Sequence, residues 1–331
     1  MKNHKAGCSH SPARALWLGM LLVGALSLLF IPVPTHTFFW KAVNNSGHVP
    51  LFMMVGMLLL NLSRLLTEKL SWPPIRHYAV ALIGVIVLAL LTEALQSLMP
   101  MREPQVSDVI HDVLGAMCAL GWSVTTDHSL SGKWSRWRTF PRRMLIACGV
   151  ALVMAMTFLP VFEWAYAYWD RGNRFPSILQ FSSNWEMKFV NTSDSHLQVV
   201  PPPLGWVKSA DDGVGQVAFH TKKYPRIRID EPYPDWEGYS YFQLDIFSEL
   251  PISVPIAIRI DDQYHNYRYE DGFNKTLHVI PGFNQIQISL DEIRAGRVGR
   301  NMDLSAIKAV MLLARNPPEE FTLYLDNIRL E

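Results

Sequence analysis

Hydrophobic and polar residues follow two different patterns in this chain, and the change falls near residue 170. Up to that point, apolar residues gather in runs long enough for helices that cross the roughly 30 Å hydrocarbon core of a bilayer. These runs predict five transmembrane helices, at residues 15–31, 49–66, 78–98, 106–124 and 144–162. Residues 1–169 are therefore expected to form an α-helical membrane domain.

In the second half, apolar and polar residues alternate with the period of a β-strand. The alternating apolar residues are Phe242, Leu244 and Ile246, then Ile256, Ile258 and Ile260, then Ile286, Ile288 and Leu290. Turn-forming pairs such as Asp271-Gly272 and Pro281-Gly282 separate these runs. The pattern predicts an all-β sandwich of jelly-roll type over residues 180–331, joined to the helices by a linker at 170–179.

Lys and Arg are unevenly distributed among the segments that join the helices. They gather in the amino-terminal tail and in the loops at 63–78 and 125–143, whereas the loops at 32–47 and 99–105 contain few. Because short loops rich in Lys and Arg stay in the cytoplasm, we expect a cytoplasmic amino terminus and, after an odd number of helices, an exported β domain. The expected location is multi-pass in the cytoplasmic (inner) membrane, with the carboxyl-terminal domain periplasmic or extracellular.

The net charge of the chain is +1, so composition gives no support to a nucleic-acid partner. The three cysteines, Cys8, Cys118 and Cys148, all lie in the first half and have no spacing typical of a metal or redox site. The β domain is therefore expected to be stable through its own hydrophobic core, without disulfides.

Among the polar residues within or between the apolar runs, seven form one candidate group: His48, Glu93, Gln96, Arg102, Asp108, His111 and Asp112. A charge in the hydrocarbon core costs at least about 2.5–3.5 kcal/mol, so such residues usually face a protein interior or a water-filled cavity. The predicted topology places all seven near the outer membrane face. Asp108, His111 and Asp112 have the i, i+3, i+4 spacing of one helix face. We expect a polar pocket at that face.

Three roles for this pocket remain open. Its residues bond one another and hold the helices together in lipid, or they bind the headgroup of an envelope lipid, with Arg102 holding a phosphate or carboxylate. The third role is catalysis, in which a carboxylate–histidine pair moves a proton. The same oxygen and nitrogen atoms suit metal ions, but no spacing predicts a specific metal site.

Around the pocket, the chain resembles the VanZ-like family of bacterial membrane proteins. The residues that carry the resemblance are His48, Glu93-x-x-Gln96, Pro100-x-Arg102, Ser107-Asp108 and Gly115-Ala116. Two positions depart from the family pattern: its Asn is Asp112 here, and the basic residue that usually precedes the His is missing from Asn44-Asn45-Ser46-Gly47. The resemblance covers about residues 15–125 and implies a cell-envelope role, with one member linked to resistance to a glycopeptide antibiotic.

Residues 180–331 resemble the galactose-binding-like jelly-roll modules of carbohydrate-binding proteins. The resemblance rests on the run of strands, the Gly282-Phe283-Asn284 turn, the Leu290-Asp291-Glu292-Ile293 turn and the closing strand at 323–330. It implies a sugar ligand. It also allows a structural calcium ion near Asp326 or Glu231, and no other cofactor is expected.

Aromatic residues are dense at 236–241 and 264–273. Aromatic faces on a sandwich suit the apolar C–H faces of sugar rings, while Asp, Asn and Arg bond the hydroxyls. The candidate glycan-binding residues are Trp236, Asp261, Asp262, Tyr264, His265, Tyr267, Arg268 and Asn274. Alternatively, these aromatic residues only stabilise a sheet by cross-strand packing.

These features together predict a membrane-anchored cell-envelope protein that recognises a glycan or glycolipid outside the cytoplasmic membrane. Its role would be accessory to envelope polysaccharide handling or antibiotic resistance. Its expected partners are the lipid bilayer, the glycan or glycolipid, and proteins of envelope biosynthesis. A membrane-embedded enzyme acting on a lipid-linked substrate is one alternative, and a scaffold that binds a partner protein is the other. Binding is favoured over catalysis.

Overall fold

The computed structural model describes residues 12–31, 37–98, 105–207, 213–266, 268–296 and 299–331. The chain divides into two compact units, Met1–Trp164 and Ala165–Glu331. The first unit is helical and the second is built mainly of β-strands, as the change of pattern near residue 170 predicts.

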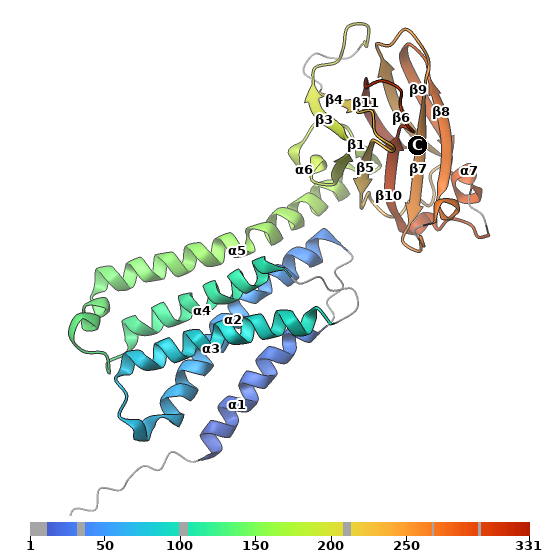
Figure 1. Cartoon of the computed structure of the whole chain (residues 1–331). Helices are drawn as coiled ribbons and strands as arrows, with labels where there is room; N and C mark the ends of the chain where they lie inside the picture. The colour runs from blue at the N-terminus through green and yellow to red at the C-terminus, as the bar shows by residue number, and fades with distance from the viewer. Residues whose placement is uncertain (1–11, 32–36, 99–104, 208–212, 267, 297–298) are drawn as a thin grey trace, which may run out of the picture. The chain divides into compact units, whose positions relative to one another are not determined.

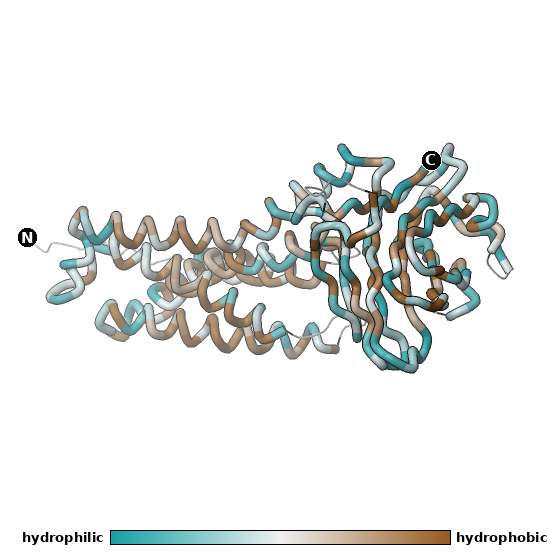
Figure 2. The backbone as a smooth tube through the Cα atoms, turned by 90° about the horizontal axis from the view of Figure 1, so that it is seen from above, coloured by the Kyte–Doolittle hydropathy of each residue, from teal (hydrophilic) through white to brown (hydrophobic). Residues whose placement is uncertain are grey.

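Five long helices are present among the described residues: α1 (Pro12–Ser27), α2 (Phe38–Leu66), α3 (Pro74–Gln96), α4 (Val106–Thr126) and α5 (Phe140–Arg174) (Figure 1). All five are long and apolar enough to cross a membrane, α1 together with the 3₁₀ turn that follows it. Figure 2 shows their long hydrophobic stretches. The prediction of five transmembrane helices is confirmed.

The boundaries of two helices differ from the prediction. α2 begins at Phe38 rather than residue 49, because the polar Asn44–Gly47 stretch is helical, and His48 therefore lies inside the helix rather than at its start. The intrinsic helix propensity of its residues is a weak guide to whether such a stretch is helical, since tertiary packing routinely overrides it. α5 continues to Arg174, and a short strand, β1 (Ser177–Leu179), pairs with the last strand of the β unit. Most of the segment expected to be a linker therefore has regular structure.

Helices α2 and α4 touch through small residues. A Cβ atom at Gly115 would lie 2.3 Å from the backbone oxygen of Val49, and one at Gly56 would lie 3.2 Å from the Cα atom of Ala116. Only small side chains allow two transmembrane backbones to approach so closely. This contact brings residue 48 of α2 next to the first turns of α4.

A polar cluster joins the ends of α2 and α4 to the start of α3. Arg64 Nη2 lies 2.5 Å from Asp127 Oδ2, and the Tyr78 hydroxyl donates to the same oxygen at 2.9 Å. Burial raises the pKa of Asp127, but hydrogen bonds from Ser129 and Tyr78 and the charge of Arg64 outweigh it and hold this pKa below its ordinary value. The carboxylate is therefore a stable anchor for three helices.

The β unit contains two antiparallel sheets (Figure 1). The first sheet has the order β3 (Ser195–Val200), β4 (Val214–Phe219), β11 (Phe321–Leu330), β6 (Tyr241–Ser248) and β9 (Gly282–Ser289), with β1 pairing beside β11. The second has the order β2 (Val190–Ser193), β5 (Arg226–Asp230), β10 (Ile307–Leu313), β7 (Val254–Asp262) and β8 (Phe273–Val279). Two short helices, α6 (Asn184–Met187) and α7 (Leu290–Ala295), complete the unit.

The core of the sandwich comes from the alternation seen in the sequence. Every second residue of β6 and β7, including Leu244, Ile246, Ile258 and Ile260, is fully buried in one cluster with residues of the other strands. Burying each such side chain contributes about 1.5–3 kcal/mol. The residues between them must therefore face outward, and they form the outer faces of the two sheets.

Candidate functional site

The outer face of the first sheet combines aromatic and polar residues from five strands. Strand pairing aligns them in rows: Gln198, Gln216, Tyr324, Phe247 and Phe283 form one row, and Asp326, Asp245 and Gln285 form the next. Gln287 pairs with Gln243 in the row after that. Residues far apart in the sequence are thus placed side by side by the register of the sheet.

An aromatic platform stands at the first of these rows. Trp206, from the loop between β3 and β4, stacks on Phe247 with ring centroids 5.8 Å apart and an interplanar angle of 10°. Its ring also lies 5.8 Å from that of Phe283, whose side chain is 46% exposed. Phe247 itself is buried. The platform therefore presents Trp206 and Phe283 to a ligand on a rigid base.

Two buried carboxylates lie in the row beside the platform. Asp245 and Asp326 pair directly across β6 and β11, and they are 8% and 4% exposed. Asn327 Nδ2 donates to Asp245 Oδ2 at 2.9 Å, while Asp245 Oδ1 has no hydrogen-bond partner within the described part of the chain. Like charges directly opposite each other destabilise a sheet. A ligand that donates hydrogen bonds to these oxygens would offset that cost.

The hydroxyl of Tyr324 is fixed within the aromatic row. It donates to Glu249 Oε2 at 2.9 Å and accepts from Gln216 Nε2 at 3.1 Å. Burial raises the pKa of Tyr324, and the hydrogen bond to Glu249 raises it further. The phenol therefore stays protonated at neutral pH.

The aromatic platform and the two buried carboxylates line one groove of about 680 Å³, which we call the first-sheet groove. Its lining includes Phe181, Val199, Trp206, Asp245, Phe283, Asp326 and Asn327. Small-molecule sites in proteins have volumes of about 300–1,000 Å³. None of these residues is among the glycan-binding candidates chosen from the sequence, and Asp326 was singled out only as a calcium ligand.

Trp236, the first of those candidates, is not available to a ligand. Its side chain is fully buried in the core, stacked on Phe242 with ring centroids 5.6 Å apart, and its Nε1 donates to the Tyr233 carbonyl. Its selection as a glycan-binding residue was wrong, because the density of aromatic residues in a sequence does not show which of them pack into the core.

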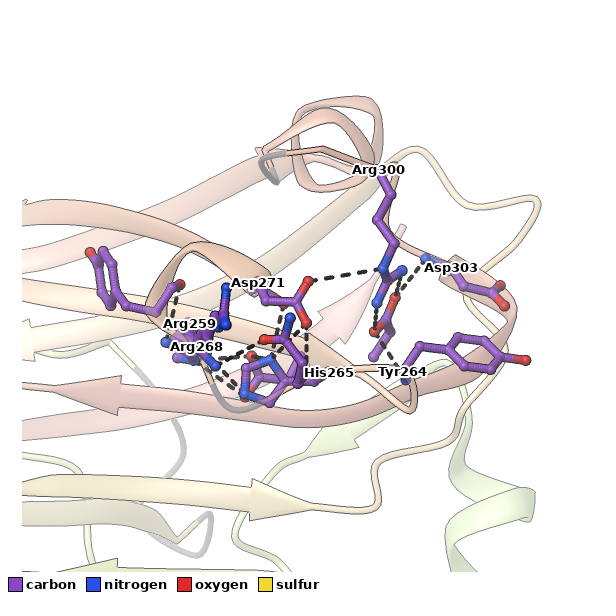
Figure 3. Close-up of polar contacts among 12 residues, drawn as sticks. Arg259, Tyr264, His265, Arg268, Asp271, Arg300 and Asp303 are labelled. Carbon is purple, nitrogen blue, oxygen red and sulfur yellow. Dashed lines mark hydrogen bonds and ion pairs between the residues drawn. The ribbon is translucent and has the colours of Figure 1, made fainter.

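Most of the remaining candidates hold the 261–274 segment together (Figure 3). Both carboxylate oxygens of Asp262, a fully buried residue, bind the Arg300 guanidinium, at 2.5 and 2.6 Å. Asn274 Nδ2 donates to the carbonyls of Tyr269 and Gly272. These contacts account for the positions of the Asp262 and Asn274 side chains without a ligand.

His265 and Asp261 both contact Arg259. His265 Nδ1 donates to the carbonyl of Asp271 at 3.0 Å, and its Nε2 accepts from Arg259 Nη2 at 3.2 Å. Burial lowers the pKa of His265, and the neighbouring Arg259 adds to this effect against the opposing charge of Asp261. Asp261 Oδ1 accepts from Arg259 Nε at 3.0 Å.

Two candidates of this segment are exposed, and one lies outside the description. Tyr264 is 61% exposed, with Arg300 stacked over its ring at 5.8 Å, and Arg268 is exposed as well. Tyr267 is outside the described residues. Whether any of this segment contacts a glycan stays a prediction.

In the helical unit, the predicted pocket residues separate into groups. His48 Nδ1 lies 2.8 Å from Asp112 Oδ1, and His48 Nε2 lies 3.8 Å from Asp108 Oδ2. All three residues are buried. The i, i+4 spacing on α4 thus directs both carboxylates at one histidine. Asp112 Oδ2 has no hydrogen-bond partner among the residues that the structure describes.

The other pocket residues have different surroundings. Glu93 Oε2 accepts from the backbone N–H of Gln105, and Gln96 Nε2 donates to the carbonyl of Leu29. His111 lines a separate cavity with residues of α2 and α5, among them Ser46 and Thr157, and does not join His48. Arg102 lies outside the described residues. In the described part of the chain, no group of three or more His, Cys, Asp or Glu side chains could hold a metal ion.

Comparison with protein-family models matches residues 14–125 to the family described as VanZ/LLP1. These residues form a VanZ-like domain. The VanZ-like domain contains His48, Asp108 and Asp112 and agrees with the resemblance predicted for residues 15–125. A comparison with curated proteins found no match.

Solved structures similar to this chain include carbohydrate-binding modules and agarases. A family 11 carbohydrate-binding module from Clostridium thermocellum, in complex with a β-1,3-1,4-mixed-linked tetrasaccharide, is 17% identical with a TM-score of 0.34, over 43% of this chain and 86% of that one. A family 30 carbohydrate-binding module from the same organism is 13% identical with a TM-score of 0.33, over 43% and 90%. An exo-β-agarase is 14% identical with a TM-score of 0.37, over 47% of this chain and only 25% of the agarase.

The helical bundle and the β-sandwich thus agree with the predicted fold class, a VanZ-like membrane domain followed by a jelly-roll sandwich. The sequence offered one signal for the groove. Outward positions of the strands, such as Asp245, Phe247 and Asp326, are polar or aromatic, but no local pattern shows that they meet.

Proposed function

We propose that this protein is a membrane-anchored glycan-binding protein of the cell envelope and that its β-sandwich holds the glycan in the first-sheet groove. The observation that carries the proposal is the aromatic platform of Trp206 and Phe283 beside the buried carboxylates of Asp245 and Asp326. Aromatic faces pack against the apolar faces of sugar rings, and carboxylates accept strong hydrogen bonds from hydroxyl groups.

The charge of the groove narrows the ligand class. Two carboxylates at its floor repel an anion, whereas the hydroxyls of a neutral sugar can each donate to them. Gln285 and Gln287, on the exposed edge strand β9, supply amide donors and acceptors on the same face. A neutral, polyhydroxylated chain therefore fits this face.

The proposal is tested with the full-length protein in detergent micelles, by calorimetry against neutral oligosaccharides that include mixed-linkage β-glucan and agarose fragments. Trp206→Ala should weaken binding about 30-fold, since removing a central aromatic anchor costs about 2 kcal/mol. Asp245→Asn keeps the shape of the side chain and should weaken binding about tenfold.

Tyr264→Ala is the matched control, because Tyr264 is an exposed aromatic residue outside the groove lining. Binding lost in Tyr264→Ala but kept in Trp206→Ala would place the site in the 261–274 segment instead. Absence of binding to every neutral oligosaccharide would contradict the proposed function.

We further propose that the helical unit crosses the cytoplasmic membrane with its amino terminus inside and the β-sandwich outside. The basic loops at 63–78 and 125–143 support this orientation. Along α2, His48 and Arg64 are about 24 Å apart at 1.5 Å per residue, so their two polar clusters fall near opposite faces of a roughly 30 Å hydrocarbon core. A reporter enzyme that works only outside the cytoplasm, fused after Glu331, should be active, and a stable but inactive fusion would contradict the orientation.

A second candidate role rests on the buried contact between His48 and Asp112. A histidine oriented by a carboxylate can transfer a proton, so the VanZ-like domain could act on a lipid-linked substrate that the sandwich presents. His48→Asn would then abolish conversion of a lipid-linked saccharide while leaving calorimetric binding of the free oligosaccharide unchanged. If conversion is unaffected, the contact serves the packing of α2 against α4.

A further inference from the structure

The outer face of the second sheet carries a row of basic residues. Ile227 and Ile229 of β5 point into the core, so Arg226 and Arg228 must point outward. Strand pairing places Arg228 beside Met311 of β10, and Met311 beside Arg259 of β7. Two guanidinium groups therefore flank one apolar side chain, with their strands separated by about 10 Å.

These residues line a second groove, of about 520 Å³, which we call the basic groove. Its charged lining is Arg226, Arg228, Arg259, Lys308 and Arg315 with the single carboxylate of Asp261. Five basic groups against one acidic group contrast with the chain as a whole, whose net charge is only +1. Asp230 and Asp261 already pair with Arg228 and Arg259, and an anion in the groove would relieve the repulsion that remains among the cations.

Two of these cations are held in place by carboxylates, whereas Arg226 is available to a ligand. The Arg259 guanidinium is fixed by Asp261 and by the carbonyls of Arg268 and Tyr269. Arg228 pairs with Asp230. By contrast, the Arg226 side chain has no ion pair or hydrogen bond among the described residues, and its cross-strand neighbours are Leu313 and Ser193. A fixed cation beside an unpaired one is a suitable arrangement for an anionic ligand.

The groove also offers surfaces for a ring. Tyr224 and Tyr269 line it and are 45% and 51% exposed. The Arg315 guanidinium lies 5.1 Å from the Tyr269 ring, which limits its motion before a ligand arrives. Met311 and Leu313 form an apolar floor between the two arginine strands.

We propose that the basic groove is a second ligand site, which binds a sugar unit bearing a carboxylate or phosphate group. Guanidinium groups bind both anions through paired hydrogen bonds, and the tyrosines and apolar floor contact the ring. The site is on the sheet opposite the first-sheet groove and has the opposite charge. It does not depend on the function proposed for that groove.

The recessed Arg259 and the half-buried Arg228 favour an anionic sugar over the headgroups of a bilayer surface. The side chains of Arg259 and Arg228 are 12% and 35% exposed. Cations that bind a flat lipid surface must protrude, whereas these line a depression that a narrow chain can enter. The volume of the groove falls within the range of about 300–1,000 Å³ typical of ligand pockets.

The test uses the full-length protein in nanodiscs of neutral phosphatidylcholine, with calorimetry at low and physiological salt. The probes are oligomers of polygalacturonate, a glycerol phosphate polymer, inorganic phosphate, vesicles of phosphatidylglycerol, and neutral agarose oligosaccharides. Arg226→Gln combined with Arg228→Gln should weaken binding of an anionic polymer at least about tenfold. Arg315→Gln, an exposed position, is the second variant and should weaken it in the same direction.

Lys222→Gln combined with Arg294→Gln removes the same charge from positions outside the basic groove, an exposed lysine and a half-buried arginine paired with Glu237, and should leave binding unchanged. Asp245→Asn should also leave it unchanged, which separates this site from the first-sheet groove. Equal losses in the groove variant and the charge-matched control would overturn the proposal. So would binding of phosphatidylglycerol vesicles alone, of inorganic phosphate alone, or of no anionic polymer.

Discussion

Replacing Gly115 with alanine tests the packing that holds the VanZ-like domain together. The added Cβ atom would lie 2.3 Å from the backbone oxygen of Val49, whereas ordinary contacts begin at 3.4 Å. The neighbour is backbone, so no side chain can rotate away and α2 and α4 must separate by about 1 Å. Overpacking of this kind costs about 1–3 kcal/mol.

Gly121→Ala is the matched control on the same helix. A Cβ atom at Gly121 meets nothing within 4 Å, so this substitution adds only the favourable helix propensity of alanine, up to about 1 kcal/mol. The two variants make the same chemical change on α4. Because both variants gain the same helix propensity, their free energies of unfolding should differ by the overpacking cost of about 1–3 kcal/mol, with Gly115→Ala the less stable.

Two measurements check this difference in the full-length protein, in a Cys8→Ser background. The first is the unfolding midpoint in a titration of the detergent-solubilised protein with a denaturing detergent, followed by circular dichroism. The second is the maleimide labelling rate of the buried Cys118, one turn beyond Gly115, relative to the exposed Cys148. Gly115→Ala should lower the midpoint and accelerate labelling of Cys118. Equal midpoints and equal labelling rates in the two glycine variants would refute the close contact of α2 and α4.

Three further predictions concern polar groups. Glu93→Gln combined with Asp108→Asn should leave the amount of this protein in the membrane normal and abolish its function if these buried carboxylates serve a ligand site. A reduced amount on immunoblots would show that the two carboxylates only hold the helices together. Asp127→Asn should destabilise the helical unit by about 1–3 kcal/mol, since it leaves Arg64 without its carboxylate. Because the folded-state pKa of Asp127 is depressed, the stability advantage of the wild type should be present above the unfolded-state pKa and disappear as pH falls through the folded-state pKa. A stability difference that persists in acid would contradict the assignment. The pKa of His265 is lowered by burial, so the unfolded state binds more protons than the folded state below about pH 6.5. In thermal unfolding, the stability of the wild type should therefore fall as pH drops below this value, and His265→Asn should remove part of this pH dependence. An identical pH dependence in both proteins would contradict the prediction.

The sequence by itself determined the kinds of element in each half of the chain. The length of an apolar run and a period of two are local properties, so five membrane helices and a sandwich were predictable without any tertiary information. The spacing of Asp108 and Asp112 also fixed their common helix face, and the structure places both toward His48. The extent of α2 was not predictable, because its polar stretch before His48 is helical against its local pattern.

Only the tertiary structure decided where the two grooves lie. The first-sheet groove combines Trp206, Asp245, Phe283 and Asp326, which strand order and register bring together from distant parts of the chain. Tertiary packing of the loop between β5 and β6 buries Trp236 in the core, although its sequence neighbourhood resembles a sugar platform. Alternation shows only that a residue lies on one of two faces of its strand. Which residues share a groove depends on strand pairing between distant segments, and that is a property of the folded chain.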